Sequence, residues 1–375
     1  MSFLSKLRLT DFRSYERADI SGLESGVIVL CGANGAGKTN VLEAVSLLAP
    51  GRGLRRAKID EVARQGGRGT WSVWSQMDAG GGVLNKIGTG LSGTSAKRVI
   101  RINGENARSQ AALADYMACL WLTPQMDRMF LDGASERRRF LDRMIFSFDP
   151  AHAGRVSRYE NVLRQRSRLL QDGKDDRAWL EALEAQMVEA GVAIAASRLD
   201  FVVALREAAL GFAVPEFPKA DIAVQGVVEG WLLEGHTALQ VEDMLRAHLV
   251  QSRSVDMRTG GASIGPHKSD LRVVYADKAM PAAQCSTGEQ KALLITIVLA
   301  HSAMIAAMRG APPVLLLDEI AAHLDEGRRG VLYDILCDMG GQVWLTGTDA
   351  ALFEALEGRA QMYGVADGGV VASSG

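Results

Sequence analysis

The pattern of apolar and polar positions near the start of the chain predicts a strand, a glycine-rich loop and a helix in close succession. Four apolar residues run from Val27 to Leu30, and apolar residues recur at helical spacing from Val41 to Leu48. An unbroken apolar run is typical of a strand buried on both faces, and a repeat of three to four residues is typical of a helix with one buried side. The residues between them therefore connect a buried strand to a helix.

Two further stretches in the first third of the chain carry the pattern of strands. Apolar and polar residues alternate from Leu4 to Thr10, and residues 66–103 combine many glycines with residues that favour strands, such as Trp71. Asn103 and Gly104 form a dipeptide that is typical of a tight hairpin turn. We therefore expect antiparallel hairpins in residues 66–103.

The middle of the chain loses the strand pattern and favours helices. Heptad-like apolar spacing and many arginines run from Glu136 to Leu210, with breaks expected near Pro150, Gly173 and Pro215. A mixed pattern returns after Gly260, with a strand expected at Leu271–Tyr275, a long helix from Glu289 and an apolar strand at Val314–Leu317.

These patterns predict an α/β head that is split in two along the sequence. Residues 1–130 form its N-terminal part, with a β-rich lobe, and residues 256–375 form its C-terminal part. A mainly helical arm is expected as an insertion at residues 131–255. A chain of 375 residues with 47% hydrophobic residues is long and apolar enough to bury a core of this size.

Charge and cysteine usage narrow the cellular setting. The net charge of −2 argues against attraction of the whole protein to nucleic acid or to an anionic membrane, so either would need a local patch. The four cysteines show no C-x-x-C spacing, as expected of free thiols in a reducing compartment. The N-terminus lacks the apolar core of a signal peptide, and the longest apolar stretch, residues 292–308, contains His301 and is short for a membrane span. We expect a soluble cytoplasmic protein with no membrane partner.

The glycine-rich loop matches the G-x-x-x-x-G-K-[ST] pattern of a phosphate-binding loop. Its glycines allow a tight turn in which backbone N–H groups and the helix N-terminus converge on phosphate oxygens. Lys38 would supply positive charge, and the Thr39 hydroxyl would bind Mg²⁺. The sequence therefore predicts ATP and magnesium as cofactors, bound by the residues of this loop: Gly32, Ala33, Asn34, Gly35, Ala36, Gly37, Lys38 and Thr39.

A pair of carboxylates ends the apolar strand at Val314–Leu317. Asp318 and Glu319 would stand at the carboxyl edge of a parallel sheet, where ligands of α/β folds bind. We expect Asp318 to hold Mg²⁺ and Glu319 to orient and deprotonate an attacking water. The alternative is an Asp-Glu pair that serves only the dipole of a following helix.

The segment Cys285–Lys291 is similar to the signature motif of ABC-type ATPases. In the ABC arrangement, Ser286 and Gly288 would open a helix whose free N–H groups face a phosphate bound by the opposite subunit. The alternative is a plain capping box, because a glutamate, Glu289, stands three residues after the serine and before an apolar run.

Further residues resemble other parts of an ABC-type site. Gln125 stands where a Q-loop would lie and could sense Mg²⁺ and the γ-phosphate, and Asp325 stands in a stretch that resembles a D-loop. Arg13 and Ser14 resemble the nucleotide-contacting residues of the SMC-like subgroup. The expected switch histidine is replaced by Thr348 and Asp349, which leaves the timing of hydrolysis open.

Three segments together resemble the RecF family of bacterial recombination mediators. They are Ser135–Asp142, Gly265–Leu271 and Thr287–Gln290, and the motifs that carry the resemblance extend from residue 13 to residue 349. The resemblance implies an SMC-like ABC ATPase head with a short arm, weak DNA-stimulated ATPase activity and an ATP-dependent homodimer. It also implies binding of single-stranded and double-stranded DNA at gap junctions, work with RecO and RecR to load recombinase at gaps and stalled forks, and a role in the SOS response.

Two arginine-rich segments could supply the DNA contacts. Residues 52–68 and 152–168 each carry a local net charge of +4 with histidine neutral, and cations beside phosphates add sequence-independent affinity. The alternative is that these residues form solvated helix faces or internal ion pairs. The candidate DNA-binding residues are Arg55, Arg56, Arg155, Arg158, Arg164 and Arg168.

Two other classes of protein share parts of this pattern. A transporter nucleotide-binding subunit has the loop, the signature and the carboxylate strand, but a long arginine-rich helical insertion is not expected in it. A small-molecule P-loop kinase would transfer phosphate to an acceptor, whereas an ATPase releases it to water.

Overall fold

The computed structural model describes residues 3–78, 83–93, 97–173 and 176–373. Contacts divide the chain into two compact units. The first unit consists of Met1–Asp127, Val214–Phe217 and Ser302–Gly375, and the second consists of Arg128–Ala213 and Pro218–His301.

The division differs from the expected segments at one boundary. Residues 256–301 group with the helical segment and not with residues 302–375. The reason is a strand that the sequence pattern did not predict, β9 (Ala220–Gln225), which pairs antiparallel with β10 (Asp270–Tyr275). The segment 131–255 is therefore not helical throughout.

The first unit contains a six-stranded, mostly parallel sheet. Its order is β15-β14-β3-β13-β12-β8, and parallel pairs join the five strands from β14 to β8. This order brings segments from both ends of the sequence together, as the split head requires. The strands are β3 (Gly26–Cys31), β8 (Cys119–Leu122), β12 (Val314–Leu317), β13 (Gln342–Gly347), β14 (Ala360–Ala366) and β15 (Gly369–Ala372).

A second six-stranded sheet in the first unit is antiparallel throughout. It confirms the strand expected at the N-terminus and the hairpins expected in residues 66–103. The predicted turn at Asn103-Gly104 connects two of its strands, with positive φ at both residues. In order, the strands are β2 (Tyr15–Ser21), β1 (Phe3–Phe12), β4 (Trp71–Asp78), β5 (Leu84–Leu91), β6 (Val99–Ile102) and β7 (Glu105–Asn106).

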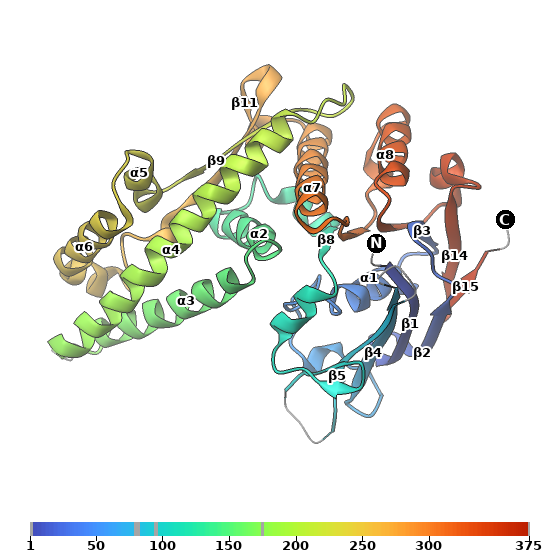
Figure 1. Ribbon diagram of the computed structural model, residues 1–375, viewed down its shortest axis with the longest axis horizontal. Helices are drawn as coiled ribbons and strands as arrows, with labels where there is room; N and C mark the ends of the chain where they lie inside the picture. The colour runs from blue at the N-terminus through green and yellow to red at the C-terminus, as the bar shows by residue number, and fades with distance from the viewer. Residues whose placement is uncertain (1–2, 79–82, 94–96, 174–175, 374–375) are drawn as a thin grey trace. The chain divides into compact units, whose positions relative to one another are not determined.

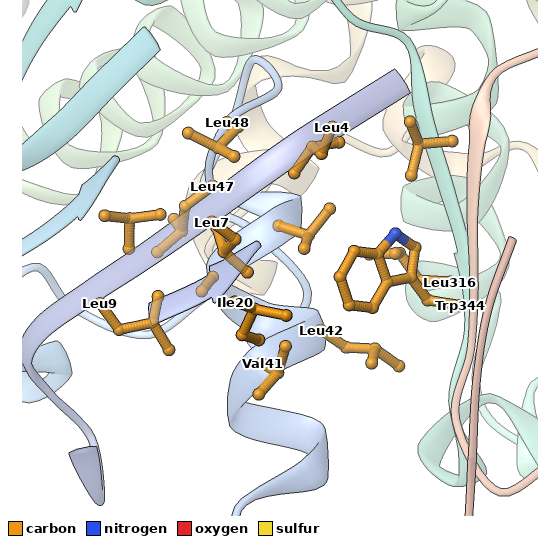
Figure 2. Close-up of a cluster of buried hydrophobic side chains, with 14 of the residues drawn as sticks. Leu4, Leu7, Leu9, Ile20, Val41, Leu42, Leu47, Leu48, Leu316 and Trp344 are labelled. Carbon is orange, nitrogen blue, oxygen red and sulfur yellow. The ribbon is translucent and has the colours of Figure 1, made fainter. Parts of the chain in front are cut away.

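Helix α1 (Lys38–Ser46) shares one hydrophobic core with both sheets. Figure 2 shows Val41 and Leu42 of this helix among leucines of β1 and beside Leu316 and Trp344 of the parallel sheet. Each of these side chains is fully buried, and complete burial of a side chain of this size contributes about 1.5–3 kcal/mol. The core therefore fixes the helix that follows the glycine-rich loop.

The remaining helices of the first unit are short apart from one. Helix α8 (Glu326–Asp338) buries Leu332, Tyr333 and Leu336. The 3₁₀ turns are η1 (Asp60–Val62), η2 (Gln110–Asp115), η3 (Pro124–Arg128, which ends in the second unit), η7 (Ala321–His323) and η8 (Ala350–Leu356).

The second unit is mainly helical, and its long helices confirm the pattern expected from residue 136 to residue 210 (Figure 1). The expected breaks lie between helices, where Asp149 caps α3 and Pro150 occupies its first turn, and where Gly173 has a φ of 63°. The helices are α2 (Ala134–Phe146), α3 (Pro150–Gln171), α4 (Arg177–Leu210), α5 (Val227–Leu233) and α6 (Ala238–Thr259). A small sheet, β11-β10-β9 with β11 at Met280–Pro281, and three 3₁₀ turns, η4 (Pro266–Lys268), η5 (Ala276–Lys278) and η6 (Ala282–Gln284), complete this unit.

Helix α7 (Thr287–Arg309) begins in the second unit and ends in the first. In the described part of the chain, it is the helix whose length and apolar composition would allow it to cross a membrane, and it is longer than the apolar stretch noted in the sequence. Its most apolar window is 72% buried inside the structure. Burial of this extent is typical of a core helix in a soluble protein.

Candidate functional site

The glycine-rich loop connects β3 to α1 in the conformation that its glycines allow. Gly35 and Gly37 have φ values of 83° and 113°, which side chains other than glycine rarely adopt. A Cβ on Gly37 would lie 2.6 Å from the Tyr15 hydroxyl, and one on Gly32 would lie 2.2 Å from the Val365 carbonyl oxygen. The loop can therefore carry no larger residue at either position without moving its neighbours.

The lysine of the loop folds over the loop backbone. Lys38 is buried, and its Nζ donates to the carbonyl oxygens of Gly32 and Ala33 at 2.7 and 3.0 Å. Its ammonium group thus lies against the loop that would cradle a phosphate.

Asp318 stands at the carboxyl end of β12, next to the phosphate loop. Thr39 Oγ1 lies 3.0 Å from each carboxylate oxygen, and Thr346 Oγ1, at the end of the neighbouring β13, donates to Oδ1 at 2.7 Å. The parallel register of β12 with β13 brings Thr346 to this edge of the sheet. The loop, the carboxylate and the threonine thus form one hydrogen-bonded site, as the sequence predicted for Thr39 and Asp318 on chemical grounds.

Glu319 adopts a backbone conformation that is unusual outside glycine. Its φ is 52°, and its N–H donates to Thr346 Oγ1 at 2.9 Å. Such a residue costs on the order of 1–3 kcal/mol and persists where its surroundings hold it, often at functional sites. Thr346 therefore binds both predicted catalytic carboxylate residues, one through its side chain and the other through its backbone.

Gln125 lies at the same edge of the parallel sheet. Strand β8 runs parallel to β12, with Leu122 opposite Leu317, and Gln125 follows in the 3₁₀ turn η3. Its side chain is exposed. The position fits the predicted Q-loop role, which stays a prediction.

The oxygen atoms at this edge fit a magnesium ion. Mg²⁺ prefers hard oxygen ligands such as hydroxyl and carboxylate groups, and the Thr39 hydroxyl and Asp318 carboxylate converge on one point. The structure also contains a buried polar atom beside the loop: the Tyr15 hydroxyl has no hydrogen-bond partner among the described residues, and burial raises the pKa of Tyr15 to about 12. Elsewhere in the described ranges no cluster of three histidine, cysteine or acidic residues could hold a metal ion.

Arg13 and Ser14 lie beside the phosphate loop in a polar cluster with α1. The Arg13 guanidinium donates to both carboxylate oxygens of Glu43, at 2.8 and 2.6 Å. Ser14 Oγ accepts from the Asn40 side chain at 2.8 Å, and the Arg55 guanidinium donates to Asn40 Oδ1 at 2.7 Å. We call Arg13, Ser14, Asn40, Glu43 and Arg55 the polar cluster.

Asp325 and Asp349 serve as helix caps. The Asp325 side chain accepts from the Arg328 N–H at the start of α8, and the Asp349 side chain accepts from the Ala351 N–H at the start of η8. Both residues are exposed, as is Thr348, the other residue at the expected position of a switch histidine.

The signature-like segment forms a capping box in the second unit. Ser286 donates its N–H and its hydroxyl to Glu289, and the Glu289 N–H points back to Ser286 Oγ at 3.4 Å. Hydrogen bonds from Lys278 and Ser286 lower the pKa of Glu289 to about 2. Ser286 is exposed and Gly288 half-buried at the start of α7, so the capping box forms while the helix N-terminus stays accessible on its own unit.

The arginines proposed for DNA binding differ in their surroundings. In the first unit Arg55 belongs to the polar cluster, and Arg56 is exposed. On α3, Arg155 pairs with Asp149, whereas the other three are exposed: Arg158, Arg164 and Arg168.

One arginine of the same α3 run is internal. Arg166 is completely buried and pairs with Glu184 at 2.9 Å and Asp256 at 2.8 Å. For this residue the alternative of an internal ion pair is correct, so the segment offers less positive charge to solvent than its composition suggests.

Sequence reasoning missed three residues of the site: Thr346, Asn40 and Glu43. The signal for Thr346 was its place directly after a buried strand, which puts it on the same sheet edge as Asp318. Asn40 and Glu43 stand three residues apart on α1 and so share a face, but no residue pattern indicated what that face would contact.

Comparison with known proteins gives a consistent result across nearly the whole chain. The family model described as the RecF/RecN/SMC N terminal domain matches residues 3–370. The DNA replication and repair protein RecF of Mesorhizobium japonicum is 49% identical over 373 residues, which cover 98% of this chain and 97% of that protein. The RecF protein of Rhizobium etli is 47% identical over the same length, with 98% of each chain covered. The chain belongs to the RecF family.

Solved structures agree with this fold. A structure of the recombination mediator protein RecF with ATP, in the RecFOR pathway, has a TM-score of 0.84 at 22% identity and covers 99% of both chains. An Smc head domain from Pyrococcus furiosus has a TM-score of 0.55 at 16% identity, covering all of this chain and 96% of the other. The SMC-like ABC ATPase head predicted from the motifs is confirmed, and membership of the RecF family excludes the alternative of a transporter subunit.

Proposed function

We propose that this protein is an ATP-dependent DNA-binding protein of recombinational repair and replication-fork maintenance. In this proposal ATP clamps two copies of the chain together on DNA, and slow hydrolysis releases them. The observation that carries it is the hydrogen-bonded site at the sheet edge, in which Thr39, Asp318 and Thr346 join the phosphate loop to the backbone of Glu319. Clamping by a ligand requires that the ligand bind the dimer better than the monomer.

Each residue of the site has a role that its position supports. Backbone N–H groups of residues 32–37 and the N-terminus of α1 would bind phosphates, with Lys38 supplying charge. Thr39 and Asp318 would hold magnesium, which neutralises charge on the phosphates when bound. Glu319 would accept the proton of the attacking water, with Gln125 at the same edge sensing the γ-phosphate. Arg13 and Ser14 would contact the nucleotide from β1 and β2, and Asp325 would act from the start of α8.

The second half of the site would come from another copy of the chain. Ser286 and Gly288 lie at the accessible N-terminus of α7, whose free N–H groups can face a phosphate. This arrangement makes ATP binding by one copy and dimerisation separable properties.

The dimer is tested by light scattering with ATP and Mg²⁺. Glu319→Gln should slow hydrolysis and accumulate the dimer, Lys38→Ala should abolish the nucleotide-dependent dimer, and Ser286→Ala should weaken the dimer while leaving ATP binding by the monomer nearly intact. A monomer that persists with ATP in Glu319→Gln would contradict the clamp. Equal loss of ATP binding in Lys38→Ala and Ser286→Ala would mean that Ser286 acts only within its own chain.

The DNA partner would be recognised by its phosphates, on single-stranded and double-stranded DNA and at gap junctions. The exposed arginines on α3 and in residues 52–68 support this part of the proposal, because cations on a surface add salt-dependent affinity. Through this binding the protein would work with RecR and RecO in the cytoplasm to load recombinase at gaps and to support the SOS response.

A gel shift on gapped, single-stranded and duplex DNA, with and without ATP, tests both the partner and the switch. Reversing the charges of Arg158, Arg164 and Arg168 should flatten the salt dependence of binding, and an unchanged slope would place the DNA site elsewhere.

A further inference from the structure

One face of helix α1 holds the basic segment, which we define as residues 52–68. The face carries Asn40, Glu43 and Ser46, which follow one another at three-residue spacing and so lie on the same side of the helix. Arg55 Nη1 donates to Asn40 at 2.7 Å and to Glu43 at 3.1 Å, and the Leu54 N–H donates to Ser46 Oγ at 2.7 Å. The helix that begins with the lysine of the phosphate loop thus contacts the basic segment at each of these three residues.

The turn between β1 and β2 holds the same segment from its other end. The Arg13 N–H donates to the Val62 carbonyl at 2.9 Å, and the Arg13 guanidinium donates to the Glu61 carbonyl at 2.7 Å. The Arg64 N–H and guanidinium bond Asp11 at 2.8 and 2.9 Å. This turn also lies against the phosphate loop, because Ser14 Oγ would be 3.0 Å from a Cβ on Gly37.

Glu43 is the residue at which these two attachments meet. Its carboxylate is 1% exposed and binds the guanidinium groups of Arg13 and Arg55 together. A buried carboxylate between two cations is held firmly, since removing its charge would leave both cations close together without compensation. Arg13 stands on the side of the phosphate loop, and Arg55 stands in the basic segment, whose residues Arg52, Arg56 and Arg68 are exposed.

We propose that Glu43 is a positioning residue that couples the phosphate loop to a nucleic-acid phosphate surface on the basic segment. A triphosphate at the loop competes with Glu43 for the Arg13 guanidinium, because both are anions within reach of one cation. When Arg13 turns toward the triphosphate, its bond to the Glu61 carbonyl is lost and Glu43 is left to Arg55 alone. The basic segment then changes its attachment, and its affinity for DNA phosphates changes with it. This inference rests on the proposed function, because it needs ATP and DNA to bind the same chain.

The test measures the coupling between the two ligands in the full-length protein. The affinity for a fluorescent duplex DNA is measured by anisotropy with and without a slowly hydrolysed ATP analogue, and the affinity for the analogue is measured with and without DNA. The two ratios must agree, because coupling between binding sites is reciprocal. We expect a factor of about 5 to 150 for the wild type, the usual range of allosteric coupling.

Glu43→Gln should bring this factor to within about twofold of one. The matched control is Glu61→Gln, which removes an equal charge from an exposed side chain in the basic segment and leaves the polar cluster intact. The control should keep the wild-type factor within about twofold. If Glu43→Gln does not fold, as judged by circular dichroism, Arg55→Gln replaces it, because Arg55 is exposed and its loss spares the pair of Arg13 with Glu43. The factor is a ratio, so loss of one DNA contact cancels from it.

A wild-type coupling factor in Glu43→Gln or Arg55→Gln overturns the inference while the proposed function stands. So does an equal loss of coupling in Glu61→Gln, which would make charge alone the cause. A wild-type protein that binds ATP and DNA without coupling also overturns the inference. Failure of the wild type to bind ATP or DNA at all overturns the proposed function and the inference with it.

Discussion

Replacing Thr346 by valine tests whether one threonine holds both catalytic carboxylate residues in place. The Thr346 side chain is completely buried, donates to Asp318 Oδ1 at 2.7 Å and accepts from the Glu319 N–H at 2.9 Å. Valine has nearly the same shape as threonine, so the substitution removes these two hydrogen bonds without opening a cavity.

The size of the effect follows from the two partners. A hydrogen bond to a charged group contributes about 1.5–3 kcal/mol, and a backbone N–H left without a partner costs about 1–3 kcal/mol when buried. Asp318 keeps the Thr39 hydroxyl and Glu319 is only half-buried, so we expect the free energy of unfolding to fall by about 2–4 kcal/mol. Glu319 would also lose the contact that holds its positive φ, so phosphate release should fall at least tenfold, which corresponds to about 1.4 kcal/mol in the activation barrier.

Urea denaturation and phosphate release with ATP and Mg²⁺ measure the two effects, and ATP binding by the monomer should change much less. Thr346→Ser is the matched control, because it keeps the hydroxyl and should recover most of the activity. The reasoning is refuted if Thr346→Val is as stable and active as the wild type, or if Thr346→Ser is as damaging as Thr346→Val.

Three further substitutions have expected outcomes. Gly37→Ala should abolish ATP binding in a filter assay, because the added Cβ would lie 2.6 Å from the Tyr15 hydroxyl at a φ of 113°; binding at wild-type affinity would contradict this. Burial lowers the pKa of His267 to about 4, so wild-type stability should fall by about 3 kcal/mol as the pH drops from 6.5 to 4, and His267→Gln should flatten this slope in urea titrations at several pH values. Arg166→Met should cost about 3–5 kcal/mol of unfolding free energy because it leaves buried acids unpaired, whereas Arg164→Gln on the same helix should change it by less than about 0.5 kcal/mol; equal effects would refute the distinction.

The parts of the fold that local pattern controls could be predicted from the sequence. The apolar strand at Val314–Leu317 lies where the pattern placed it, and the capped breaks at Asp149 and Gly173 separate the helices as expected. In each case a few neighbouring residues decide the conformation, through unbroken apolar character, a cap or a positive φ.

The parts that depend on distant partners could not be predicted. Strand β9 exists because Ala220–Gln225 pairs with β10, and its short alternating pattern is too weak to stand out between helices. Arg166 looks like its neighbours in the sequence, and only the return of α6 past α3 makes Asp256 its partner. The candidate site divides in the same way, since the phosphate loop and Asp318 have recognisable motifs, whereas Thr346 and Glu43 are defined by the residues they contact.

The order of strands in the parallel sheet has a consequence for how the chain folds as it is made. Strand β3 ends at Cys31, and its neighbours β13 and β14 begin at Gln342 and Ala360. At a synthesis rate of about 5–20 residues per second, β3 leaves the ribosome roughly 15–60 seconds before either neighbour exists. During this time the phosphate loop is attached to a strand with two open edges, and unpaired edges invite aggregation. A nascent chain that stops before residue 342 would therefore lack a folded nucleotide site however much of the second unit it has completed.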